Sequence, residues 1–254
     1  MQWFTNLEVW QQALLASLIM YAMTTLGASF VFFSKKLNQF FLTALTGAAA
    51  GIMIAASFFS LLLPATQYES AIPSYLTVTI AFLLGGAFII FSDLALSRTQ
   101  FRFRKFGDKK NALLFFAVTL HNIPEGMSVG VAFAAPGASA LTALFLAIGI
   151  AVQNFPEGMC VAFPLRVKGM SPLKSFLFSQ GSGLIEIPAC ILGAVAAGAI
   201  AGLMPWALAF SAGTMIAVVC SELIPECFAG NKTVASAGII LGFSLMMILD
   251  LALG

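Results

Sequence analysis

The sequence predicts an all-α, polytopic membrane protein with eight transmembrane helices. Of its 254 residues, 60% are hydrophobic and only 9% are charged, a composition too apolar for a water-soluble domain. The hydropathy breaks into eight stretches, each long enough for a helix to cross a bilayer, which takes roughly 20 residues. The predicted spans are 13–33, 40–64, 75–96, 111–134, 139–164, 175–201, 206–228 and 233–253. Together they form a single transmembrane domain, residues 1–254, with almost no room for a soluble appendage.

The loops between the spans carry the topological signal. Residues 1–12 contain Glu8 and no basic residue, so we expect no cleaved signal peptide and a first span that is retained. All 12 basic residues follow spans one, three, five and seven, and they are Lys35, Lys36, Arg98, Arg102, Arg104, Lys105, Lys109, Lys110, Arg166, Lys168, Lys174 and Lys232. The positive-inside rule therefore places these loops in the cytoplasm and both termini outside.

The basic run at 98–110 is open to a second interpretation. Its charge would also suit a nucleic-acid or lipid-headgroup patch. A short basic loop between two spans is nevertheless what the positive-inside rule predicts. We therefore expect the lipid bilayer and no nucleic acid as a partner.

One seven-residue motif, called the duplicated phrase below, occurs twice in the middle of the chain. Residues 121–127 read HNIPEGM and residues 153–159 read QNFPEGM, 32 positions later. A glutamate, a proline and amides are costly inside a lipid-spanning helix. The two copies lie on the adjacent spans four and five, so they run in opposite directions through the membrane. This duplication predicts one shared polar site.

Two weaker repeats suggest how the remaining spans are arranged. Residues 50–55 and 212–217 share the pattern A-G-x-M-I-A in spans two and seven, and residues 84–96 and 241–253 share L-G followed by D-L-A-L in spans three and eight. The offsets are 162 and 157 positions, and each pair lies five spans apart, so the copies are antiparallel. They predict a 3+2+3 plan of inverted repeats, although spans one and six show no clear match. Inverted repeats are a common architecture of secondary transporters.

Polar side chains gather near the middle of spans two, four, five and six. His121 and Glu125 are four positions apart and share a helix face, as do Gln153 and Glu157. Three midplane glutamates would cost about 2.5–3.5 kcal/mol each, and the sequence offers no lysine or arginine at that depth, so a bound cation is the simplest counter-charge. The candidate metal ligands are Met53, His121, Asn122, Glu125, Gln153, Asn154, Glu157 and Glu186.

The ligand types narrow the choice of cation. Imidazole with carboxylates suits zinc, iron, manganese, cobalt, nickel or cadmium better than magnesium or calcium. With all three midplane glutamates ionised, one divalent ion leaves a charge of about −1 and two leave about +1, so either a second metal or a proton fits. For Met53, packing alone is an alternative. For Glu222 and Glu226, in the cytoplasmic third of span seven, interfacial placement and an exit site are both open.

These motifs resemble those of the ZIP (Zrt/Irt-like) divalent-metal transporters over essentially all eight spans. The features that carry the resemblance are H-N-x-P-E-G at 121–126, x-N-x-P-E-G at 153–158 and Glu186 in span six. The A-G-x-M of span two and S-E-L-I-P-E at 221–226 of span seven are most similar to the bacterial GufA-type branch.

The resemblance implies a binuclear metal site between spans four and five. The residues that match the family's main transport site are His121, Glu125, Gln153, Glu157 and Met53. Those that match its neighbouring site are Asn122, Glu125, Asn154, Glu157 and Glu186, the two glutamates bridging. It also implies import of divalent metal, with zinc foremost and iron, manganese or cadmium as alternatives. Alternating access would move spans one, four, five and six against spans two, three, seven and eight. A bacterial inner membrane and a homodimer are further expectations.

The sequence also departs from relatives and argues against other classes. Gln153 stands where many relatives have His, and Asn154 stands where some have Asp. His121 is the only histidine, so no histidine-rich loop is present. An intramembrane metalloprotease would need H-E-x-x-H, and a primary pump would need a nucleotide-binding segment. We therefore expect no enzyme and no resident cofactor. A cation channel, or a proton or sodium carrier using the same acidic site, remains the alternative.

Overall fold

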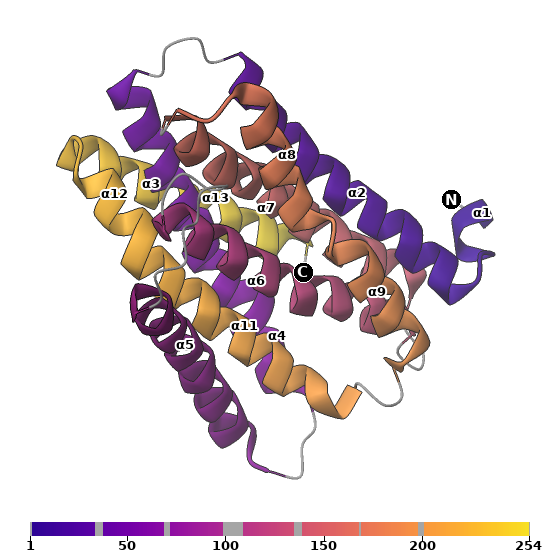
Figure 1. Cartoon of the computed structure of the whole chain (residues 1–254). Helices are drawn as coiled ribbons and strands as arrows, with labels where there is room; N and C mark the ends of the chain where they lie inside the picture. Colours follow the sequence, from indigo (N-terminus) through magenta and orange to yellow (C-terminus); the bar gives the residue numbers. More distant parts are fainter. Residues whose placement is uncertain are drawn as a thin grey trace.

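The computed structural model describes residues 2–33, 38–68, 72–98, 109–134, 139–167, 169–197 and 201–253. Within these ranges every regular element is helical (Figure 1). The α-helices are α1 Gln2–Thr5, α2 Val9–Ser29, α3 Gln39–Ala56, α4 Leu63–Gln67, α5 Ser74–Arg98, α6 Lys109–Ala134, α7 Ala140–Val167, α8 Pro172–Gly183, α9 Glu186–Val195, α11 Met204–Val218, α12 Ile224–Phe228 and α13 Lys232–Leu253. The short connecting helical segments are η1 Phe30–Phe32, η2 Ser57–Leu62, η3 Ala201–Leu203 and η4 Val219–Leu223.

Capping residues explain where several helices begin. The side chain of Asn38 accepts a hydrogen bond from the backbone N–H of Phe40 before α3, and that of Ser171 accepts from the N–H of Lys174 before α8. Glu8 and Gln11 form a reciprocal capping box before α2. Each cap satisfies a backbone donor that the first helical turn leaves without a partner.

The described residues contain seven helical segments long and apolar enough to cross a membrane, one fewer than the predicted count of eight. They are Val9–Phe32, Gln39–Gln67, Ser74–Ala95, Ala140–Phe163, Pro172–Val195, Met204–Phe228 and Lys232–Ala252. The predicted fourth span corresponds to α6, which is 26 residues long. Its central His121, Asn122 and Glu125 lower its hydropathy. The prediction of an all-α, polytopic membrane protein is confirmed, whereas the count of eight is reached only when α6 is added.

Two of these segments are irregular at related positions. The segment Gln39–Gln67 continues from α3 through the π-helical η2 into α4, and the segment Met204–Phe228 continues from α11 through the π-helical η4 into α12. Pro64 and Pro225 stand at the starts of α4 and α12, and a proline inside a helix removes a backbone donor and promotes such irregular turns. The π-helical turn therefore recurs in both copies of the inverted repeat.

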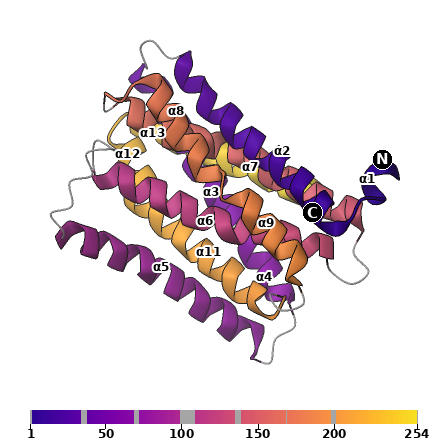
Figure 2. The same ribbon diagram turned by 45° about the vertical axis from the view of Figure 1, so that its right-hand side comes forward.

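The pairing of helices shows the inverted symmetry over the whole bundle. The four most extensive helix contacts join α3 to α13, α11 to α5, α2 to α7, and α6 to α9. Exchanging span one with six, two with seven, three with eight and four with five converts the first contact into the second and the third into the fourth. The 3+2+3 arrangement therefore includes spans one and six, for which the sequence showed no match. In Figures 1 and 2, α2 and α5 lie at opposite edges of the bundle.

Four glycines explain why the two weaker repeats contain that residue. A Cβ on Gly51 would overlap the carbonyl oxygen of Ile239, and a Cβ on Gly213 would overlap that of Phe82. Gly213 lies 162 positions after Gly51, and Phe82 lies 157 positions before Ile239, so the two contacts are related by the repeat offsets. The same holds for Gly85 against Phe210 and for Gly242 against Ala48. Small residues allow this close approach of membrane helices, so the repeats mark two equivalent helix contacts, α3 with α13 and α11 with α5.

Three of the described basic residues lie toward one end of the bundle. Arg166 ends α7, Lys174 lies near the start of α8, and Lys232 begins α13. The starts of α8 and α13 lie at the end opposite both chain termini in Figure 2. The predicted basic positions Lys35, Lys36, Arg102, Arg104, Lys105 and Lys168 lie outside the described residues.

Candidate metal centre

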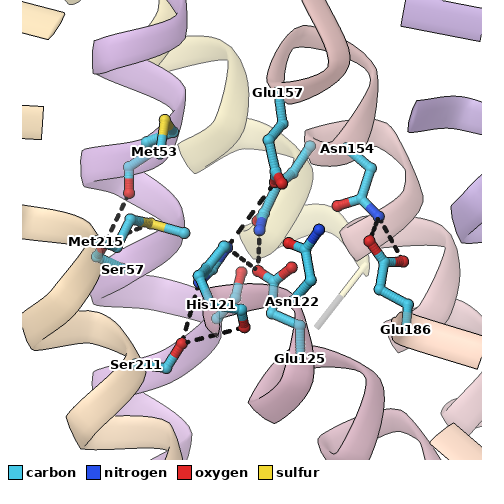
Figure 3. Close-up of polar contacts among 12 residues, drawn as sticks. Met53, Ser57, His121, Asn122, Glu125, Asn154, Glu157, Glu186, Ser211 and Met215 are labelled. Atoms are coloured by element: carbon cyan, nitrogen blue, oxygen red, sulfur yellow. Dashed lines mark hydrogen bonds and ion pairs between the residues drawn. The ribbon is translucent and has the colours of Figure 1, made fainter. Parts of the chain in front are cut away.

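A histidine and two glutamates meet in the middle of the bundle. His121 and Glu125 come from one face of α6, and Glu157 comes from α7 (Figure 3). The Nε2 atom of His121 lies 3.1 Å from Oε1 of Glu125 and 3.9 Å from Oε2 of Glu157. One potential ligand atom of each residue lies within 4.8 Å of the others, and all three side chains are buried. The spacing is compact enough for a single metal ion to bridge them.

Two amide side chains of α7 donate hydrogen bonds to carboxylates of the neighbouring helices α6 and α9. Nε2 of Gln153 donates a short hydrogen bond to Oε1 of Glu125. Nδ2 of Asn154 donates to both oxygens of Glu186, at 2.9 and 2.8 Å. The two copies of the duplicated phrase therefore serve the same polar region, as predicted from their antiparallel placement.

A break in the sixth span brings Glu186 into this region. Helix α8 ends at Gly183, and Glu186 begins α9, two residues before Pro188. The break exposes the carbonyl of Ser182, which accepts a hydrogen bond of 3.1 Å from Nδ2 of Asn122. A helix N-terminus carries a partial positive charge, so the start of α9 is a favourable place for a buried carboxylate.

Many polar atoms of the site have no hydrogen-bond partner. Apart from the contacts of the His121 ring with Glu125 and Glu157, these buried atoms have no hydrogen-bond partner within the described part of the chain. They are Nε2 of His121, Oδ1 of Asn122, Oε2 of Glu125, Oε1 of Gln153, Oδ1 of Asn154, and both carboxylate oxygens of Glu157. A buried polar atom without a partner costs about 1–3 kcal/mol. Nearly all of these atoms are acceptors or lone-pair donors, which is the set that a bound cation would satisfy.

The eight predicted site residues are all buried, but they do not form one cluster. His121, Glu125 and Glu157 share the compact group described above. Glu186 lies beyond Asn154, on the far side from His121 (Figure 3). Met53, on α3, lies on the opposite side and lines a narrow pocket together with His121. Glu222 belongs to η4 and Glu226 to α12. Both are far in sequence from the histidine cluster, from Glu186 and from Met53.

Sequence reasoning missed two residues on α11. The hydroxyl of Ser211 lies 3.0 Å from Nδ1 of His121, and Met215 lines the same pocket as Met53. Met215 could have been found, since it occupies the position of Met53 in the second copy of A-G-x-M-I-A. Ser211 carried no signal, because its counterpart in the first copy is Ala49.

Fold and site together define a polytopic membrane protein with a buried cluster of metal-ligating side chains at its centre. The chain matches the family described as ZIP Zinc transporter over residues 99–250. This range contains both copies of the duplicated phrase and Glu186. The chain therefore belongs to the ZIP family, in agreement with the resemblance drawn from its motifs.

Proteins with related sequences extend the match over nearly the whole chain. "Zinc transporter GufA" of Myxococcus xanthus is 35% identical, covering 95% of this chain and 98% of its own. "Zinc transporter ZIP11" of Homo sapiens is 32% identical, covering 96% and 97%. "Zinc transporter ZIPB" of Bordetella bronchiseptica is 37% identical, covering 92% and 79%. The similarity to GufA confirms the predicted relation to that branch.

Proposed function

We propose that this protein is a secondary transporter that carries divalent transition-metal ions, zinc foremost, into the cytoplasm. The observation that carries the proposal is the convergence of His121, Glu125 and Glu157, with their ligand atoms within 4.8 Å in a buried setting. Imidazole and carboxylate together favour ions such as Zn²⁺, Fe²⁺, Mn²⁺ or Cd²⁺ over Mg²⁺ and Ca²⁺. The relatives named as zinc transporters support zinc as the first candidate. A carrier of this kind has no reaction to catalyse and no resident cofactor.

We assign the cargo two neighbouring subsites. The first comprises His121, Glu125, Gln153, Glu157 and Met53. The second comprises Asn122, Glu125, Asn154, Glu157 and Glu186, so that Glu125 and Glu157 serve both. The unpartnered amide oxygens of Asn122 and Asn154 support the second subsite, because they lie between the histidine cluster and Glu186 (Figure 3).

Alternating access follows from the symmetry of the bundle. The pairs α2 with α7 and α6 with α9 make one unit, and α3 with α13 and α11 with α5 make the other. We propose that the first unit, which holds seven of the eight ligands, moves against the second unit, which holds Met53. Two equivalent arrangements of inverted repeats give inward-open and outward-open states. We further propose that both termini lie outside the cytoplasm. Residence in a bacterial inner membrane and assembly as a homodimer stay predictions.

Uptake into proteoliposomes tests the function. Wild-type protein should take up zinc at a rate that saturates with concentration, and His121→Ala and Glu157→Ala should each abolish most of this uptake. Glu8→Gln is the matched control, because Glu8 lies before α2, outside the site. Equal uptake of every metal by wild type and both variants would refute the site. Single-channel currents would indicate a channel, and absence of any bound metal would favour a proton or sodium carrier.

A further inference from the structure

We propose that Met215 is a second thioether ligand for the cargo, and that with Met53 it forms a soft face of the site that favours a thiophilic cation such as Cd²⁺ over a hard one such as Mn²⁺. This inference rests on the proposed transport function. It adds a ligand from α11 that neither the eight predicted ligands nor the metal-ligating cluster includes.

The two methionines surround a common space with the histidine. A narrow pocket is lined by Met53 from α3, by Val118 and His121 from α6, and by Met215 and Val218 from α11. Both thioether side chains are nearly inaccessible, 4% exposed for Met53 and 2% for Met215. Figure 3 shows them on the side of His121 that faces away from Glu186.

Symmetry places the two sulfur atoms in equivalent roles. Met53 and Met215 are the same position of the A-G-x-M-I-A repeat, 162 residues apart. The helices that carry them, α3 and α11, are exchanged by the inverted symmetry. A thioether that reaches the site from one copy is therefore matched by a thioether from the other copy. Met53 on α3 and Met215 on α11 both belong to the second unit.

Neighbouring hydroxyl groups hold the soft face in place. The hydroxyl of Ser57 lies 2.7 Å from the sulfur of Met215, and also 2.7 Å from the backbone carbonyl of Met53. The hydroxyl of Ser211 holds Nδ1 of His121 at 3.0 Å, so Nε2 is the nitrogen left for metal. A thioether sulfur has two lone pairs, and a hydrogen bond to one leaves the other for a metal ion.

The chemistry of sulfur gives the expected selectivity. Thioether ligands select soft cations, whereas carboxylate and carbonyl oxygens suit Mg²⁺, Ca²⁺ and Mn²⁺. The glutamates and amides of α6 and α7 supply the hard face, and the methionines supply the soft one. The competing explanation is that Met215 only fills the core, where methionine is a common gap filler. Packing alone predicts that leucine, which has a similar volume, would serve equally well.

Binding of Cd²⁺ and Mn²⁺ to the purified full-length protein separates the two explanations. Met215→Leu should weaken Cd²⁺ binding about tenfold while Mn²⁺ binding changes little. Met204→Leu is the matched control, because Met204 is equally buried on α11 but does not line the pocket. An unchanged preference for Cd²⁺ in Met215→Leu would overturn the inference.

X-ray absorption at the cadmium edge counts the sulfur neighbours of bound Cd²⁺. Because its main result comes from the wild-type protein, it does not require that a variant folds. Wild-type protein loaded with Cd²⁺ should show two sulfur neighbours, and Met215→Leu should show one. A wild-type spectrum with only nitrogen and oxygen neighbours, or with one sulfur, would refute the role of Met215. If His121→Ala loses Cd²⁺ in that case, the proposed transport site survives. If wild-type protein binds no metal at all, the proposed function itself fails.

Discussion

At the scale of single residues, the site is distinguished by buried polar atoms that lack a hydrogen-bond partner within the described part of the protein. Both oxygens of Glu157 and one oxygen of Glu125 are buried without a hydrogen-bond partner in the described structure, whereas both oxygens of Glu186 accept from Asn154. Glu125 and Glu157 therefore depend on a cation more strongly than Glu186 does, which fits the bridging role proposed for them.

Removing the charge of Glu125 tests this dependence. Glu125→Gln keeps the size of the side chain but removes a negative charge and a strong metal ligand, so we expect zinc affinity to fall about tenfold or more. Isothermal titration of zinc into purified protein measures the change. Glu8→Gln, which keeps an oxygen able to cap α2, should bind like the wild type. Equal affinity in Glu125→Gln would remove this residue from the site.

Ser211 tests the support behind the histidine. Its hydroxyl orients the His121 ring through Nδ1, and loss of such an outer partner typically lowers metal affinity about 10–100-fold. Ser211→Ala should therefore bind zinc more weakly in the same titration. Ser17→Ala is the control, because Ser17 is also buried but bonds only to the carbonyl of Leu14 in its own helix. Wild-type affinity in Ser211→Ala would show that packing alone orients the ring.

At the scale of elements, close contacts between helix pairs organise the bundle. The α3–α13 and α11–α5 pairs depend on glycines facing a partner's carbonyl oxygen, and these glycines recur in both copies of the repeat. The sixth span in addition contains a break between α8 and α9, where Asn122 donates a hydrogen bond to the carbonyl of Ser182. The glycine contacts thus join the helices of the second unit, and the broken sixth span supplies the ligand Glu186 to the first unit.

A methyl group at one of these contacts should destabilise the fold. In Gly213→Ala the new Cβ would overlap the backbone of Phe82, which cannot move aside cheaply, so we expect a loss of about 1–3 kcal/mol. Thermal unfolding of the detergent-solubilised protein should show a lower midpoint. Gly149→Ala is the matched control, since its Cβ would meet nothing within 4 Å and alanine is the better helix former. A midpoint no lower than that of Gly149→Ala would contradict the proposed contact.

At the scale of the whole molecule, charge and inverted symmetry together define how the protein would sit in the membrane. Three of the described basic residues, Arg166, Lys174 and Lys232, lie toward the end of the bundle away from the termini. An excess of basic residues on one side orients a membrane protein with that side in the cytoplasm. The direction of transport can be assigned only relative to this orientation.

Cysteine labelling in intact cells tests the orientation. In a Cys220→Ser background, which removes the one exposed native thiol among the described residues, Thr5→Cys should react with a membrane-impermeant maleimide. Lys174→Cys should react only after the cells are opened. Both positions are exposed, so each should label in detergent, which serves as the control. The opposite pattern would place the termini in the cytoplasm.

The sequence alone determined the fold class, the membrane segments and the set of candidate site residues. Apolar runs and the cost of buried charge act locally, so the segments could be placed to within a few residues, apart from the start of the first at Val9 and the end of the sixth at Val195. The duplicated phrase revealed the site because glutamate and proline are rarely tolerated inside a span.

Only the tertiary structure decided which of these residues meet. It grouped His121 with Glu125 and Glu157, set Glu186 beside Asn154, and brought Ser211 and Met215 to the histidine. It also revealed the equivalence of spans one and six, which share no pattern of residues. Such contacts depend on how helices distant in sequence pack against one another. The presence of a serine or a methionine in an apolar helix does not by itself predict which side chain of another helix it will contact.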